Sequence, residues 1–136
     1  MQSLKVRTQS SDEAEAVFYE AFRHGDLAVM SALWAGDDVV CVHPGSGLIR
    51  GHEAVIRSWR HIFESGPPTI RDTRTSQFAA DGLAVHMVVE EILDEDEVAV
   101  AIVLATNVYR RYDYGWLMVE HHGSVVQQDR KGATLQ

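Results

Sequence analysis

Three side chains that can exchange protons or bind metal ions stand in a row near the end of the chain, in the stretch GWLMVEHHGSVV: Glu120, His121 and His122. The stretch is mostly apolar and predicts a strand, in which neighbouring side chains point to opposite faces. His121 and His122 therefore cannot both face the interior. His121 shares its face with Gly123, which leaves space, and we expect it to point inward. His122 and Glu120 are then expected on the outer face, at a contact with a second subunit, unless a β-bulge reverses the alternation.

A second candidate pair lies in the apolar stretch DDVVCVHP, where Cys41 and His43 share one face of a predicted strand. Cys41 could be a nucleophile with His43 as its base. An apolar environment raises a thiol pKa, however, and favours the alternative of a buried, inert thiol.

His86 and Glu90 share one face of another predicted strand. The opposite face is entirely apolar and makes a better core, with Leu83, Val85, Met87 and Val89. Because charged groups are rarely buried, we expect His86 and Glu90 to face solvent or a second subunit.

A metal site would need several of these groups to converge. His43, His86 and His121 lie on different predicted strands, and none has the local His/Cys spacing typical of zinc sites. The sequence also lacks a glycine-rich phosphate loop, so we predict neither a metal nor a cofactor.

The elements that must position these groups follow from hydrophobic periodicity and turn residues. Ser10 is expected to cap the first helix, and Gly25 to end it. Two more helices are expected at 27–35 and 52–65, and a short strand within DDVVCVHP, followed by a loop, PGSGLIRG. Four strands then follow, at 69–80, 82–93, 97–111 and 115–126.

This order predicts an α+β fold in which three N-terminal helices pack on one face of a curved, mostly antiparallel sheet. We expect a single domain over residues 10–126, with flexible ends at 1–9 and 127–136.

The strand predicted at 97–111 is apolar on both faces, so both are expected to be covered. One face is bulky, as for packing on another sheet or subunit. The other carries alanines and ends in Asn107 and Tyr109. Small residues there indicate either close packing of a helix or a hollow that could hold a small molecule. Trp34, Trp59 and Phe63 lie on inward helix faces, where they would serve as core and as the wall of such a hollow.

Composition excludes several classes of protein. Twenty acidic and twelve basic residues give a net charge of −8, which argues against binding to nucleic acid. One cysteine allows no internal disulfide. The chain shows neither a signal region nor a membrane-spanning run, so we expect a cytoplasmic protein.

The residues FYEAFRHGDLAVMSALWAGDDVVCVHPGSGLIRGHEAVIRSW, together with GWLMVEHHGSVV, resemble the nuclear-transport-factor-2-like (cystatin-like) superfamily. Within it the chain resembles most the SnoaL-like and ketosteroid-isomerase-like small proteins, over about residues 12–126. The resemblance implies a cone-shaped α+β fold. It does not fix the reaction, because one fold carries many functions.

Three positions can be carried over from the isomerases. Their proton-shuttling carboxylate precedes a proline, and His43 takes its place here. An imidazole exchanges protons near neutral pH. Phe18 stands where they have a tyrosine, so that hydroxyl is missing. Asn107 stands where they have an aspartic acid donor. Tyr109 could supply the missing hydroxyl, or be a rim aromatic with its hydroxyl in water.

The sequence therefore predicts a small-molecule-binding protein in which His43 moves a proton on an apolar carbonyl compound and Asn107 stabilises the oxygen. The ligand would contact the cavity wall, made of Phe18, Trp34, Trp59, Phe63, Tyr109 and His121. The alternative is a non-catalytic ligand-binding or dimerisation module. In both cases we expect a homodimer joined through its sheets.

Overall fold

The computed structural model describes residues 5–128. The helices in this range are α1 (Ser11–His24), α2 (Leu27–Leu33) and α3 (His52–Glu64). The strands are β1 (Val40–Val42), β2 (Ile49–Arg50), β3 (Thr69–Ala80), β4 (Leu83–Leu93), β5 (Ala99–Tyr112) and β6 (Gly115–Gln128). The predicted order is confirmed, with one addition: β2 lies in the segment expected to be a loop.

Local signals set the ends of the first two helices. The Ser10 hydroxyl accepts a hydrogen bond from the Glu13 amide at 3.1 Å, as an N-cap does. Gly25 ends α1 in the left-handed conformation, with φ of +62°. Asp26 then caps α2 by accepting from the Val29 amide. The chain therefore turns sharply between the two helices, as predicted.

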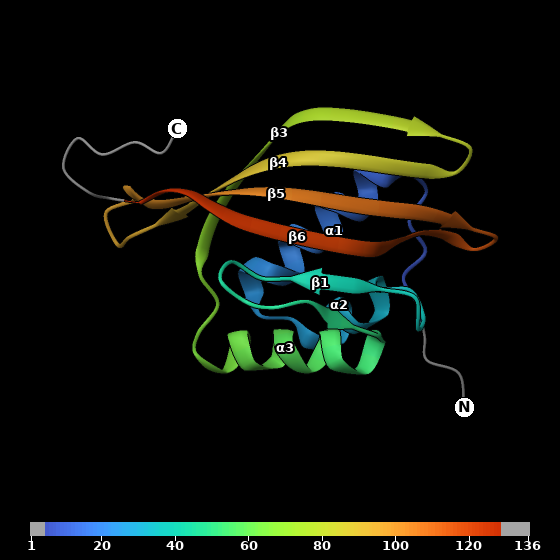
Figure 1. Cartoon of the computed structure of the whole chain (residues 1–136), viewed down its shortest axis with the longest axis horizontal. Coiled ribbons are helices and arrows are strands. Elements are labelled where there is room, and N and C mark those ends of the chain that lie inside the picture. The colour runs from blue at the N-terminus through green and yellow to red at the C-terminus, as the bar shows by residue number, and fades with distance from the viewer. Residues whose placement is uncertain (1–4, 129–136) are drawn as a thin grey trace.

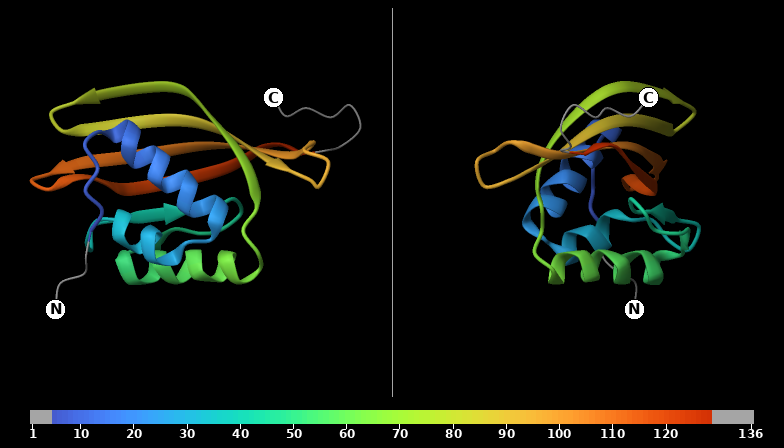
Figure 2. Two further views of the ribbon diagram at one scale, coloured as in Figure 1. Left: turned by 180° about the vertical axis from the view of Figure 1, so that it is seen from behind. Right: turned by 60° about the vertical axis from the view of Figure 1, so that its left-hand side comes forward.

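The six strands form one sheet in the order β2-β1-β6-β5-β4-β3. Strand β1 runs parallel to β6, and all other neighbours are antiparallel. In Figure 1 the sheet lies in front of α1, and in the reversed view of Figure 2 the helices lie in front of the sheet. The three helices thus cover one face of a curved, unclosed sheet, which confirms the predicted α+β architecture.

Strand β4 faces the other way from the prediction. Ala84, His86, Val88 and Glu90 are buried under the helices, whereas Leu83 on the opposite face is 41% exposed. The expectation that His86 and Glu90 point outward is therefore wrong. The physical reason lies in α1, which offers both of them polar partners.

Strand β5 has the predicted faces. Ala105, Asn107 and Tyr109 are buried beneath the helices, and Leu104 on the other face is 36% exposed. Tyr109 has no exposed surface, so the interpretation of it as a rim aromatic is wrong.

Strand β6 settles the question of the adjacent histidines. His121 is buried and His122 is exposed, as predicted. The register with β5 does shift, at Val119, and this bulge turns Met118 inward. Because the bulge precedes His121, it does not reverse the histidines. A Cβ atom at Gly123 would lie 3.2 Å from Val103, so the glycine permits close packing there and does not open a hollow.

The first described residues are fixed to the body of the protein. Thr8 is buried, its backbone oxygen accepts from the Trp116 amide, and its hydroxyl donates to the Trp116 carbonyl. The predicted flexible N-terminal end is thus wrong for residues 5–9. Gln127 and Gln128, which fall in the predicted flexible C-terminal end, are the last residues of β6 and pair with β5. Residues 1–4 and 129–136 lie outside the described range.

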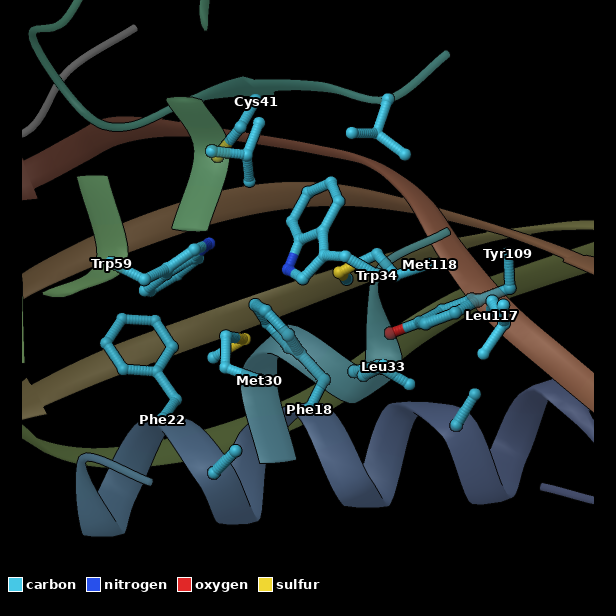
Figure 3. Close-up of a cluster of buried hydrophobic side chains, with 14 of the residues drawn as sticks. Phe18, Phe22, Met30, Leu33, Trp34, Cys41, Trp59, Tyr109, Leu117 and Met118 are labelled. Atoms are coloured by element: carbon cyan, nitrogen blue, oxygen red, sulfur yellow. The ribbon is translucent and has the colours of Figure 1, made fainter. Parts of the chain in front are cut away.

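The core lies between the helices and the sheet and is rich in aromatic rings. Phe18, Trp34 and Trp59 are fully buried there (Figure 3). Between residues 5 and 128, none of the helices has the length and apolar character needed to cross a membrane.

Candidate functional site

Four buried polar side chains form a continuous hydrogen-bonded chain between α1 and the sheet. His121 Nδ1 lies 2.6 Å from Asn107 Oδ1, and Asn107 Nδ2 donates to the Tyr19 hydroxyl at 2.9 Å. The Tyr19 hydroxyl donates to Glu90 Oε2 at 2.7 Å. We call Glu90, Tyr19, Asn107 and His121 the buried relay.

Three strands and one helix position the relay. Asn107 and His121 are directly paired across β5 and β6, and Glu90 comes from β4. Tyr19 reaches them from α1, one residue after Phe18. Sequence reasoning missed Tyr19, although it supplies a buried hydroxyl beside the position where the isomerase tyrosine is replaced by Phe18. Its place next to Phe18 on a helix with buried aromatics was the available signal.

The order of donors fixes the protonation of His121. Because the Asn107 amide nitrogen is used on Tyr19, its oxygen faces His121 and accepts the proton on Nδ1. The Nε2 atom of neutral His121 then carries a lone pair. Burial, together with repulsion from His43 and His122, lowers the pKa of His121 to about 3, so the ring is neutral at neutral pH.

At the other end of the relay, Glu90 titrates near neutrality. Burial raises the pKa of Glu90, the Tyr19 hydrogen bond opposes this, and the charge of Asp72 adds to it, which gives a pKa of about 7. Burial also raises the pKa of Tyr19, with a further contribution from Glu90, so Tyr19 keeps its proton.

His43 lies just after β1 and is oriented by α3. Its Nε2 lies 2.8 Å from the Ser58 hydroxyl, which itself donates to the Val55 carbonyl at 2.6 Å. Ser58 has one proton, so it accepts from His43 Nε2–H, and the lone pair of neutral His43 is on Nδ1. Burial lowers the pKa of His43 to about 4. His43 is therefore a second neutral, oriented imidazole.

His43, Trp59 and His121 are in mutual contact, and we call them the ring cluster. The ring centroids lie 4.7 Å apart for His43 and Trp59, 5.6 Å for Trp59 and His121, and 6.2 Å for the two histidines. Phe18 packs on His121 at 5.1 Å, and the half-buried Phe63 packs on Trp59 at 5.9 Å. Five of the predicted site residues are thus brought together.

The other predicted site residues are placed differently. Asn107 is fully buried, and His121 stands between it and His43. Both ends of its amide are engaged within the relay. Trp34 is buried elsewhere in the core, and Tyr109 packs on His86 with ring centroids 5.0 Å apart.

Cys41 is buried next to His43, with Sγ 3.6 Å from Nε2. Burial raises the pKa of the thiol to about 12. The thiol therefore stays protonated at neutral pH, which favours the alternative of an inert cysteine.

A second polar cluster explains why His86 points inward. His86 Nδ1 lies 2.8 Å from Glu15 Oε1, and Nε2 lies 3.1 Å from the Ser11 hydroxyl. Arg74 approaches the other Glu15 oxygen at 3.5 Å. Helix α1 thus satisfies the buried imidazole, as buried polar groups require.

The described residues form no metal cluster at the site. Among residues 5–128, no group of three or more His, Cys, Asp or Glu side chains could hold a metal ion. A hollow of about 460 Å³ lies at another place, between the α2–β1 connection and the sheet, and its polar lining includes Asp37, Asp38, Arg110 and Glu120. The ring cluster is packed instead with its own aromatic side chains.

Comparison with solved structures shows close relatives of this arrangement. A candidate calcium/calmodulin-dependent protein kinase type II association domain from Thiobacillus denitrificans is 36% identical, with a TM-score of 0.85, over 90% of this chain and 100% of that one. A candidate dehydratase of the NTF2-like family from Streptomyces avermitilis is 32% identical, with a TM-score of 0.76, over 86% and 94%.

More distant matches agree on the fold. A ketosteroid isomerase-like protein from Erwinia carotovora atroseptica is 16% identical, with a TM-score of 0.73, over 85% of this chain and 93% of that one. Among curated proteins, the F-box protein SKIP8 of Arabidopsis thaliana is 32% identical over 115 residues. The match spans 82% of this chain but about half, 48%, of that protein.

The family model that describes the SnoaL-like domain matches residues 13–128, which include all the helices and strands except the first two residues of α1. The fold, the site geometry and this match lead to one conclusion: the chain belongs to the SnoaL-like domain family.

Proposed function

We propose that this protein binds a small, mostly apolar carbonyl compound at the ring cluster and exchanges a proton with it, as an isomerase or lyase does. The observation that carries the proposal is the pair of neutral imidazoles, His43 and His121. Each imidazole donates a hydrogen bond through one ring nitrogen, and the other ring nitrogen therefore carries a lone pair. Apolar rings surround both, an environment typical of small-molecule sites.

In this proposal His43 is the catalytic base. Its Nδ1 removes a proton from the carbon beside the ligand carbonyl, and the resulting imidazolium returns the proton to the product. Asn107 is a positioning residue, because its amide is already hydrogen-bonded to His121 and Tyr19. No cofactor takes part.

The ligand would approach from the half-buried side of the cluster. Phe18 and Trp59 are fully buried and fill the centre, whereas His43 and Phe63 are partly exposed. A ligand of the proposed size needs Phe63 to turn aside, a side-chain motion that binding energy can drive.

One solved relative supports a lyase, and we propose that the protein acts in the cytoplasm. A protein described as a candidate dehydratase is 32% identical over most of this chain. Dehydration next to a carbonyl begins with the same proton removal that we assign to His43.

The proposal is tested by proton exchange with solvent. With 2-acetonaphthone in D₂O, the protein should replace the protons beside the carbonyl with deuterium, as followed by ¹H NMR. His43→Ala should lower the rate at least tenfold, since general base catalysis contributes about 10²–10⁴-fold. His122→Ala, on the exposed outer face, is the matched control and should keep the rate. An equal rate in the His43 variant would remove this residue from the mechanism.

A second candidate function, an assembly module, rests on a different observation. The face of β3–β5 turned away from the helices carries apolar side chains that the protein itself leaves open to solvent. We call it the outer sheet face, made of Phe78, Leu83, Val85, Met87, Val89, Leu104 and Val108. Phe78 is 65% exposed. Large exposed apolar patches of this kind mark interaction sites.

The outer sheet face is bordered by polar residues of the flanking strands. Thr73 on β3 and Ser124 on β6 flank the central pair of Val89 and Leu104. An apolar centre with a polar rim is the usual anatomy of a protein interface. A candidate association domain at 36% identity supports an assembly role.

We therefore propose a homodimer joined through the outer sheet faces. Analytical ultracentrifugation should give a mass of about twice 15.2 kDa for the full chain. A monomer at concentrations up to about 1 mM, where even weak association would be visible, would exclude the assembly module. It would leave the ligand-binding proposal unchanged.

A further inference from the structure

The Trp59 indole nitrogen is a buried donor that lacks an acceptor. Trp59 has no exposed surface, and its Nε1–H has no hydrogen-bond partner among residues 5–128. Buried donors are nearly always paired, so an orphan of this kind calls for an explanation. In Figure 3 the nitrogen lies on the edge of the ring turned toward Cys41. Cys41 contacts His43 and is paired with His121 across β1 and β6.

His121 presents the complementary group in the same cluster. Its Nδ1–H donates to Asn107, and the ring makes no other hydrogen bond to the described part of the chain. The relay thus holds Nε2, at the far end of the ring from the backbone, as an acceptor. The ring centroids of His121 and Trp59 lie 5.6 Å apart, close enough for one atom to contact both rings.

An unpaired donor on Trp59 and an acceptor on the neighbouring ring of His121 together match one hydroxyl group. A hydroxyl oxygen accepts from an N–H, and its own proton is donated to a lone pair. A carbonyl oxygen only accepts, and it would leave His121 Nε2 without a partner. Sites built to hydrogen-bond a hydroxyl reject analogues that lack it, because their own polar groups are then left unpaired.

We propose that the ring cluster recognises a hydroxyl group of the ligand, which accepts from Trp59 Nε1–H and donates to His121 Nε2. This inference rests on the proposed ligand site and adds a feature to its substrate, which then carries a hydroxyl as well as a carbonyl. Trp59 is a binding residue in this assignment, and His121 is the acceptor oriented by the relay.

The protein contains a natural control for Trp59. Trp34 is also fully buried with an unpartnered indole nitrogen, but it makes none of the aromatic contacts that join the ring cluster. Trp34→Phe and Trp59→Phe make the same chemical change, because each replaces an indole ring and its N–H group by a phenyl ring. Only Trp59→Phe should affect the recognition of a hydroxyl.

The test compares two probes with one carbon skeleton: 1-(2-naphthyl)ethanol, an alcohol, and 2-acetonaphthone, its ketone. Binding to the full chain is titrated by calorimetry. The alcohol should bind about tenfold more tightly than the ketone, the value of one hydrogen bond to a group otherwise left unpaired. Trp59→Phe should weaken binding of the alcohol by about tenfold, and Trp34→Phe should leave it unchanged.

A second measurement needs no variant and therefore does not depend on how Trp59→Phe folds. In long-range ¹H–¹⁵N spectra of the wild-type chain, the Nε2 signal of His121 should move upfield with the alcohol and stay in place with the ketone. Equal affinities, an unmoved Nε2 signal, or equal effects of the two tryptophan variants would overturn the hydroxyl assignment while ligand binding stands. Failure of both probes to bind would contradict both proposals.

Discussion

Glu90 has almost no contact with water, and its protonation links folding to pH. Its pKa of about 7 lies above the ordinary glutamate value of 4.5, so the folded protein holds this proton more tightly than the unfolded chain. The stabilisation is complete below pH 4.5 and is lost as pH rises toward 7. The difference amounts to about 3 kcal/mol, at 1.36 kcal/mol for each pKa unit.

Glu90→Gln should remove this dependence, because an amide accepts from Tyr19 but does not titrate. Urea unfolding of the wild type between pH 4.5 and 7.5 should show stability falling relative to Glu90→Gln. Glu95→Gln, at an exposed position of the β4–β5 turn, is the control. Parallel pH profiles for the wild type and Glu90→Gln would show that Glu90 is ionised in the folded protein throughout this range.

The contact between Asn107 and His121 is open to a direct test. Asn107→Asp places a carboxylate against His121 Nδ1, and an opposite charge at this distance raises an imidazole pKa by about 1–3 units. NMR titration should therefore show the His121 pKa rising from about 3. The same variant cannot donate to Tyr19. An unchanged His121 titration would mean that the side chain at position 107 does not contact this ring.

At the scale of residues, sequence patterns predicted apolar positions better than polar ones. The inward direction of His121 followed from alternation along one strand, which is a local property. His86 and Glu90 were assigned to the wrong face because their partners, Glu15 and Tyr19, each lie 71 positions away in the sequence. Burial of a polar group depends on such partners, and the hydrophobic periodicity of one strand does not reveal them.

Helix α1 is joined to the sheet by a polar row as well as by its aromatic rings. Ser11, Glu15 and Tyr19 recur every fourth residue on one helix face and bond to β4 or β5. Removing one partner of such a buried pair leaves the other without a hydrogen bond, which lowers the free energy of unfolding by about 1–3 kcal/mol. Removing both partners costs less than the sum of the two single changes.

A double-mutant cycle measures this contact between elements. Glu15→Leu and His86→Leu should each lower the free energy of unfolding by about 1–3 kcal/mol, with a coupling energy of about 0.5–3 kcal/mol in the double variant. Glu13→Leu, exposed on the same helix, should cost under about 1 kcal/mol. Strictly additive effects in the cycle would show that the hydrogen bond between Glu15 and His86 does not help to dock α1.

Helices and strands were predictable from the sequence where their hydrophobic pattern is long or where capping and turn residues mark their ends. Strand β3 matches its predicted range, and the cap at Ser10 and the stop at Gly25 hold. Strand β2 was not predicted, because a strand of two residues is too short to show a periodic pattern. The bulge at Val119 escaped it because its cause is the register with β5, not a local residue signal.

The whole molecule combines a net charge of −8 with an apolar outer sheet face. Like charges on two subunits repel, so association must come from the apolar centre of this face. Leu104 is its most central exposed residue, paired with Val89 on β4. A lysine there would bury a charge in each half of the proposed dimer, at a cost that exceeds the gain from reduced net charge.

Dimerisation of the folded chain makes thermal stability depend on concentration, because mass action favours the associated state. Above the dissociation constant, each tenfold rise in protein concentration should add about 1.4 kcal/mol per dimer and raise Tm. Leu104→Lys should abolish this dependence. Leu48→Lys, at a site that is 54% exposed between β1 and β2, should retain it. A wild-type Tm that stays constant up to a protein concentration of about 1 mM, where even weak association would be visible, would mean that the outer sheet face does not hold two copies together.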